Sequence, residues 1–132
     1  MSTYEQIAGL PVEIESYELE GRELPFGDQF TRYTTLIRLR GAGEEGVGED
    51  VTYDGIDHAN FQAGGTGLPI TGSHTIDSFS QLLDGIELFP DPPVREPSID
   101  YRRWAFESAA LDLALRQAGR SLADQLEASR GR

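Results

Sequence analysis

The residues whose types and spacing could do chemistry gather around one glycine-rich segment. Asp54, Asp57 and His58 stand together in YDGIDH, and His74 follows at the far end of that segment. Imidazole and carboxylate groups can bind a divalent metal, and an imidazole titrates near neutral pH. The spacing matches neither the twelve-residue calcium loop nor the zinc motif H-E-x-x-H. We therefore favour a solvated cluster here, with a small metal-dependent enzyme as a minor alternative, and either histidine could meet a substrate.

Other motifs exclude whole classes of chemistry. Gly41–Gly46 matches the dinucleotide fingerprint G-x-G-x-x-G, but the sequence continues as the strand-like VGEDVTY instead of a helix that would face a pyrophosphate. We therefore predict a hairpin turn there. No serine lies in a G-x-S-x-G elbow, cysteine is absent, and all eleven basic residues are arginine. Thiolate nucleophiles, Schiff-base lysines and a Walker lysine are thus excluded within this chain.

Length and charge limit the possible partners. The chain has 132 residues, enough for one domain, and a formal net charge of −12. The electrostatic field of a chain with this negative charge repels nucleic acid and anionic membrane surfaces. No apolar run approaches the ~20 residues of a spanning helix, and the opening does not resemble a secretory signal. The composition predicts a cytoplasmic domain that binds neither nucleic acid nor membrane.

The first fifty residues predict an antiparallel meander. Alternation in Val12–Leu19 predicts a strand with one wet face, although the alternation is imperfect. Gly21–Thr31 is turn-rich and is expected to form a loop. Tyr33–Arg40 is β-branched and alternating, and Val47–Tyr53 is expected to return beside it as a hairpin.

The rest of the chain predicts a long loop and then helices. Residues 54–74 contain five glycines and no periodicity, and structureless loops of that length are usually functional. Helical spacing and capping residues predict three helices after it: 76–86 with Thr75 as cap, Ile99–Ala118 between Ser98 and Gly119, and a short one from Leu122 to about Ala128. A proline-rich connector separates the first two helices. The predicted fold class is therefore α+β.

The helix 99–118 is apolar nearly all round. Its small residues, at Ala105, Ala109, Ala110 and Ala114, let another element approach closely. Such a helix needs cover on more than one side. It is either the central helix of one small core, or one of its flanks meets a partner or a missing domain.

Three stretches, taken in order, resemble the N-terminal capping domain of the enolase superfamily, in its mandelate racemase and muconate lactonizing enzyme branch. Thr34–Asp50 is similar to that family's second and third strands and their Gly-x-Gly-Glu ending. Arg102–Leu126 is similar to the helix that leads out of the capping domain. Gly119–Leu122 resembles the Gly-x-Pro-Leu turn, with Ser121 in place of proline. The resemblance covers nearly all of a core of about 11–128.

This resemblance implies a division of labour between two domains. The capping domain is a three-stranded antiparallel β-meander followed by two to three helices, and residues 1–132 would form one such domain. A separate C-terminal TIM-type barrel, absent from this chain, would hold Mg²⁺ and the acid and base groups that abstract a proton α to a carboxylate. The chain would then be a non-catalytic piece of a racemase, cycloisomerase or dehydratase, with no cofactor of its own. Its partners would be its own barrel, a small carboxylate substrate and, within the parent enzyme, further copies.

In that family two flap loops of the cap shape the substrate pocket. They correspond here to Gly21–Thr31 and Tyr53–His74. The motifs do not align within the flaps, so residue type alone selects candidate substrate contacts: Phe26 and Phe30 as apolar walls, and Tyr53 and His58 as polar or aromatic contacts. The alternative hypothesis is a self-contained α+β binding or assembly module that uses the Ala-rich helix 99–118 as its interface.

Overall fold

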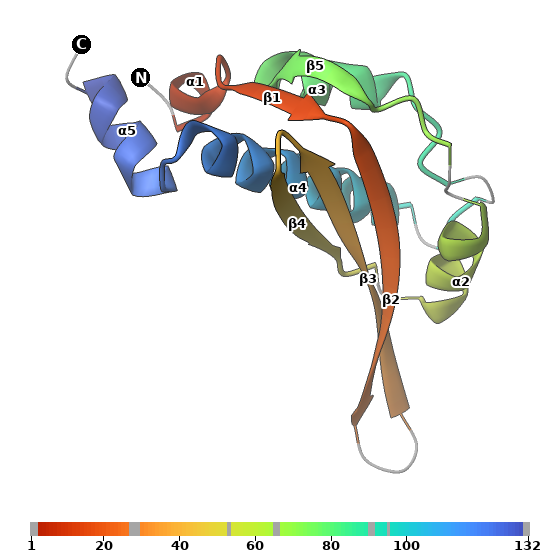
Figure 1. The fold of residues 1–132 in the computed structure, drawn as a ribbon. Coiled ribbons are helices and arrows are strands. Elements are labelled where there is room, and N and C mark those ends of the chain that lie inside the picture. Colours follow the sequence, from red (N-terminus) through yellow and green to blue (C-terminus); the bar gives the residue numbers. More distant parts are fainter. Residues whose placement is uncertain are drawn as a thin grey trace.

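The computed structural model describes residues 3–26, 30–52, 54–64, 67–89, 92–94 and 96–130. A three-stranded antiparallel sheet contains β2 (Ser16–Phe26), β3 (Phe30–Gly41) and β4 (Glu44–Asp50), and β1 (Pro11–Ile14) pairs with β5 (Gly72–Thr75). The helices are α1 (Thr3–Ile7), α2 (Gly55–Gly64), α3 (Ile76–Asp84), α4 (Ser98–Ala118) and α5 (Leu122–Arg130). The predicted α+β class is confirmed (Figure 1). No helix in these ranges is long and apolar enough to cross a membrane.

The β3–β4 turn confirms the predicted hairpin in place of a dinucleotide site. Ala42 and Gly43 both have positive φ, 51° and 79°, and the flanking Gly41 and Glu44 are paired across the strands. Two successive residues with positive φ are the mark of the tight turn that suits the strands' right-handed twist. The glycines of Gly41–Gly46 therefore serve a turn and close packing.

The glycines of β4 allow α4 to lie directly on the sheet. A Cβ at Gly46 would overlap the backbone of Ala109, and one at Gly48 would overlap the backbone carbonyl of Ala105. Asp112 of α4 also accepts a hydrogen bond from the Val47 amide at 2.9 Å. Because both surfaces lack large side chains, the helix and strand backbones approach closely. The Ala-rich face of α4 is therefore buried inside this chain.

The predicted strand over Val12–Leu19 is two strands. Val12 and Ile14 are buried in β1, whereas the inward positions of β2 have the opposite parity, as at Tyr17 and Leu19. The pairing changes at Glu15, whose amide donates to Arg40 of β3. The imperfect alternation in the sequence was the signal of this break, since a one-residue shift moves side chains to the other face.

The prediction of a loop over Gly21–Thr31 is wrong for the described part of that segment. β2 and β3 continue as a ladder out to the pair Phe26 and Phe30, while β4 pairs with β3 only from Thr35 inward. Arg22–Phe26 and Phe30–Thr34 therefore form a two-stranded hairpin arm that extends beyond the rest of the molecule (Figure 1). Tertiary pairing overrides the turn propensity of this stretch.

The prediction of a structureless loop over residues 54–74 is also wrong. Residues 55–64 form α2, and residues 72–75 form β5 against β1. The buried residues of α2 are Asp57, His58 and Phe61. These positions are spaced by about one helical turn, but the glycines around them hide this helical pattern in the sequence.

The helix ends are predicted with mixed success. Thr75 caps α3 in a reciprocal capping box with Ser78, and Gly119 ends α4 in the left-handed conformation, both as expected. The prediction of Ser98 as a cap is wrong, because Pro97 occupies that position without a side-chain cap. Ser98 is instead the first residue of α4, and its buried Oγ has no hydrogen-bond partner among the residues that the structure describes.

The sheet face opposite α4 carries a network of ion pairs. Arg38 bonds Glu20 and Glu45, and Arg40 bonds Glu45 and Glu18, at 2.7 to 3.1 Å. Hydrogen bonds from Arg38 hold the pKa of Glu20 below its ordinary value, and those from Arg40 and Arg38 do so for Glu45. These groups are open to solvent, so the network satisfies the charges of the exposed face without desolvating them.

Lowering the pH is expected to weaken the fold through this face. Since the folded-state pKa values of Glu20 and Glu45 lie below the ordinary value of 4.5, their stabilisation is complete above that pH and disappears as the pH falls below it. The thermal unfolding midpoint should therefore decrease as the pH is lowered from about 6 to about 3. The decrease should be less steep in Glu45→Gln than in the original chain. An identical pH slope in the two proteins would contradict this.

Candidate functional site

A groove of about 460 Å³ lies between the hairpin arm and the N-terminal half of α2. Except for Tyr33, its lining residues come from the two segments that the sequence singled out as flaps. The lining residues are Glu23, Tyr33, Gly55, Ile56, His58, Ala59 and Gln62. Tyr33 and Ile56 are exposed at 40 % and 62 %, so the groove has an apolar rim that is open to solvent.

Two glycines let α2 dock against the arm. A Cβ on Gly21 would overlap the side-chain amide of Gln62, and one on Gly55 would lie 2.8 Å from the Tyr33 ring. At Gly55 a side chain would push the Tyr33 ring away, whereas at Gly21 the end of the flexible Gln62 side chain would have to move. The turn-rich composition of the two flap segments therefore serves close packing.

His58 anchors α2 to the sheet through a chain of hydrogen bonds. Its Nε2 lies 2.7 Å from the Thr52 carbonyl oxygen, and its Nδ1 lies 2.8 Å from Thr35 Oγ1, which accepts from Gln62 Nε2 at 3.0 Å. A carbonyl can only accept, so Nε2 carries the proton and Nδ1 accepts from the hydroxyl. The ring is 1 % exposed, and both nitrogens are engaged. His58 thus positions the wall of the groove.

A buried arginine supports α2 from beneath. Arg102 Nε donates to Asp50 Oδ2 at 2.6 Å, and its other nitrogens donate to the carbonyls of Leu88 and Asp57 at 3.0 and 3.2 Å. The guanidinium lies 3.8 Å from two ring centres, those of Phe61 and Phe89. Burial lowers the pKa of Arg102, and the charge of Asp50 opposes that shift. One side chain therefore joins β4, α2 and α4.

The polar groups of YDGIDH are used within the fold. The Asp57 carboxylate is buried and accepts from the Val94 amide at 3.1 Å, and both nitrogens of His58 are engaged. Within the described ranges, no group of three or more histidine, cysteine or acidic side chains could hold a metal ion. The favoured interpretation of this motif as a solvated cluster is wrong for Asp57 and His58, because packing against α4 and β3 buries both.

Of the four predicted substrate contacts, the structure places His58 in the groove. Phe26 and Phe30 are backbone partners in the β2–β3 register, and their side chains lie outside the described part of the structure. Tyr53 also lies outside the described residues. Sequence reasoning missed the other six lining residues, among them Glu23, Tyr33, Ile56 and Gln62. The β3 pattern could have indicated Tyr33, because it shares the parity of the inward-facing Thr35 and Ile37.

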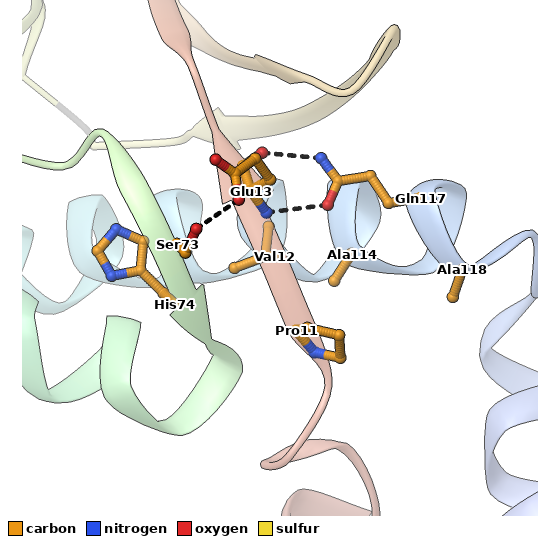
Figure 2. Close-up of a pocket in the computed structure, with 8 residues that line it drawn as sticks. All are labelled: Pro11, Val12, Glu13, Ser73, His74, Ala114, Gln117 and Ala118. Atoms are coloured by element: carbon orange, nitrogen blue, oxygen red, sulfur yellow. Dashed lines mark hydrogen bonds between the residues drawn. The ribbon is translucent and has the colours of Figure 1, made fainter.

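A second cavity, of about 290 Å³, lies between β1, β5 and the C-terminal half of α4 (Figure 2). The side-chain amide of Gln117 in α4 accepts a hydrogen bond from the Glu13 amide at 2.9 Å and donates one to the Glu13 carbonyl at 2.7 Å. It thus bonds the backbone of β1 in the same way as the backbone of a neighbouring strand. Ser73 donates to the carboxylate of Glu13 (Figure 2). The polar side chains here hold β1 to α4 and β5, which makes this cavity a packing seam.

One family model matches nearly the whole chain. It is described as the N-terminal domain of DUF8230, a domain of unknown function, and it matches residues 5–125. No curated protein and no solved structure matches the sequence significantly. The match supplies a family and an N-terminal position within it, but no activity.

Proposed function

The chain belongs to the family described as the DUF8230 N-terminal domain, and on this premise we propose that it is the substrate-specificity capping domain of a magnesium-dependent enolase-superfamily enzyme. The parent enzyme is of the mandelate racemase and muconate lactonizing type. It abstracts a proton α to a carboxylate and acts as a racemase, cycloisomerase or dehydratase. This chain contributes to binding and does not catalyse the reaction alone.

The groove is the observation that carries this proposal. Gly21–Thr31 and Tyr53–His74, far apart in the sequence, contribute most of the described hairpin arm and α2, and these two elements meet at the groove. A cap that shapes a pocket needs two such elements side by side, with an apolar rim that can exclude water when it closes on another domain. The α+β architecture and the family's description as an N-terminal domain support the same interpretation.

Each domain has its own task in this proposal. Mg²⁺ would be held by the barrel, outside this chain, where it offsets negative charge that develops on a carboxylate substrate. The described residues do not fit such a site, since Asp50 and Asp57 are both engaged within the fold. Tyr33 and Ile56 instead offer apolar surface to the part of the substrate remote from the reacting carbon. The chain therefore sets the size and polarity of the pocket.

Exchange of the α-proton in the full-length protein tests this function. We expect ¹H NMR in D₂O with Mg²⁺ to show loss of the α-proton signal for some members of a panel of carboxylates. Ile56→Asp should change the ratio of kcat/KM between apolar and polar substrates roughly tenfold, because it places a charge on the groove rim. Leu122→Asp, which places the same charge on another exposed apolar residue, on α5, should leave that ratio unchanged.

Two results would contradict the proposal. One is the absence of Mg²⁺-dependent exchange with every carboxylate in the panel. The other is exchange whose substrate profile is unaffected by Ile56→Asp, since the groove would then not contact substrate.

A second candidate function, the assembly module, is favoured by exposed apolar side chains on α4. The Ala-rich flank is buried against β4, so the interface would use the exposed Ile99, Tyr101 and Trp104, the last at 56 % exposure. Tyr101 and Trp104 contact each other with ring centres 5.7 Å apart. A homo-oligomer of the parent enzyme could use the same surface. Sedimentation equilibrium would favour this candidate if the chain self-associates and Trp104→Ser abolishes the association.

A further inference from the structure

A carboxylate and an aromatic ring lie opposite each other on the groove side of the hairpin arm. Glu23 of β2 and Tyr33 of β3 are direct partners in the register, and both line the groove. Successive residues of a strand alternate between faces, so Glu23 shares its face with Gly21, over which Gln62 packs. The pair therefore faces α2 and not the charged outer face of the sheet.

Glu23 differs from the other acids of β2 because no cation is paired with it among the described residues. Glu18 pairs with Arg40 and Glu20 pairs with Arg38 on the outer face. Within the described part of the chain, Glu23 makes no ion pair or hydrogen bond. No arginine is among the groove-lining residues, and lysine is absent from the sequence. The negative charge of Glu23 is thus left uncompensated beside the groove.

The amide of Gln62 adds a second acceptor. Its Nε2 donates to Thr35 Oγ1 at 3.0 Å, which fixes the orientation of the amide and leaves Oε1 on the side of Gly21. Oε1 makes no hydrogen bond to the described residues. Arg22 and Arg32, which have the opposite strand parity from Glu23 and Tyr33, bond Glu20 and the Val51 carbonyl instead. The groove is therefore lined by a carboxylate, a side-chain amide and a phenol ring.

We propose that this groove binds a cationic group, an alkylammonium or a guanidinium, between the carboxylate of Glu23 and the ring of Tyr33. A carboxylate offers charge and hydrogen bonds to such a group, and the face of an aromatic ring attracts a cation through its quadrupole. Gln62 Oε1 accepts one further N–H. An anionic group would meet Glu23 without any compensating cation and is disfavoured.

The inference rests on the proposed function for the identity of the whole ligand. If the carbon next to the substrate's carboxylate loses its proton in the barrel, the substrate also carries a positive charge at its remote end. The substrate class is then amino acids or their derivatives with a basic side chain or a free amine. Because the groove is open to solvent, the chain by itself should bind a simple cation only weakly, in the millimolar range.

An NMR titration of the 132-residue chain tests the groove without any activity. The probe is n-butylammonium, with n-butanol and butyrate as its neutral and anionic counterparts. We expect saturable shifts of the Tyr33 ring and Gln62 side-chain amide signals with butylammonium, and no saturable shifts with the other two probes. Glu23→Gln should weaken the binding at least fivefold. Glu44→Gln, the same charge change at the exposed β3–β4 turn, should leave the binding unchanged.

Charge reversal gives a second variant that keeps the test decisive. Glu23→Lys should abolish binding of butylammonium and permit butyrate to shift the same signals, and unchanged shifts elsewhere would show that the fold is intact. Butylammonium binding that survives Glu23→Gln, or butyrate binding to the original chain, would overturn the inference. Exchange of α-protons by the full-length protein despite such a result would leave the capping function standing. Binding of the cation without any such exchange would remove the capping function alone.

Discussion

Replacing Arg102 by methionine is expected to lower the free energy of unfolding by about 3–5 kcal/mol. The side chain of Arg102 is fully buried and pairs with the equally buried Asp50 at 2.6 Å. Methionine retains much of the volume but leaves the Asp50 carboxylate without its cation. The carbonyls of Leu88 and Asp57 also lose their donors. Such a loss is a large part of the stability of a small domain.

Arg103→Met is the matched control on the next position of α4. Arg103 is partly exposed and pairs with Asp84 at the surface, which raises its pKa. Loss of a solvent-exposed pair costs about 1 kcal/mol or less. Chemical denaturation of the three proteins, with equal m-values, gives the comparison. Equal losses for the two variants would show that the Arg102 pair is not buried as described.

This prediction also bears on the groove. Arg102 binds the carbonyl of Asp57 in the first turn of α2, and His58 on the following position binds the sheet. Loss of the hydrogen bonds of Arg102 to Asp50 and Asp57 should therefore release the N-terminal half of α2, which forms one wall of the groove. In the titration with butylammonium, Arg102→Met should weaken binding even where the chain remains folded.

Replacing Gly48 by alanine is expected to destabilise the fold by about 3 kcal/mol. A Cβ at this position would overlap the backbone carbonyl of Ala105, and a backbone atom cannot move aside as a flexible side chain can. The strand and α4 would have to separate, which loosens the contact between the sheet and the Ala-rich face of the helix. Thermal and denaturant unfolding measure the loss.

Two other glycines calibrate this effect. Gly9→Ala places its Cβ in open space and should change the stability by no more than about 0.5 kcal/mol. Gly43→Ala also meets no atoms, but its φ of 79° strains an alanine by about 1–2 kcal/mol. If Gly48→Ala changes the stability as little as Gly9→Ala does, β4 does not pack closely on α4 as described.

Local patterns predicted the elements that depend on neighbouring residues. The β3–β4 hairpin follows from alternation on both sides of a glycine-rich turn, and α3 and α4 follow from apolar periodicity with Thr75 and Gly119 at their ends. Each of these signals acts within one turn or one strand pair, so the sequence contains it directly. The candidate site was only partly predictable, because His58 was chosen by its residue type and not by what lies near it.

The two flap segments show where local patterns fail. Gly21 and Gly55 suggested loops, but the absent side chains admit Gln62 and Tyr33 from the facing element. A glycine that serves a turn and a glycine that serves close packing cannot be distinguished from one sequence, because the difference lies in a distant part of the chain. The same holds for Asp57 and His58, whose burial depends on β3, β4 and α4.

The sequence by itself determined the α+β class, an acidic composition, a chain without lysine or cysteine chemistry, and the two segments that supply all groove-lining residues except Tyr33. Composition and short-range periodicity suffice for these properties. The tertiary structure decided that the described residues of these segments form the β2–β3 ladder, α2 and β5, and that Arg102 joins α2 to β4. It also decided that Glu23 faces Tyr33 across the arm, with no cation bonded to Glu23 in the described part of the chain. Such facts arise from pairing register and burial, which bring together residues whose separation in the sequence carries no local signal.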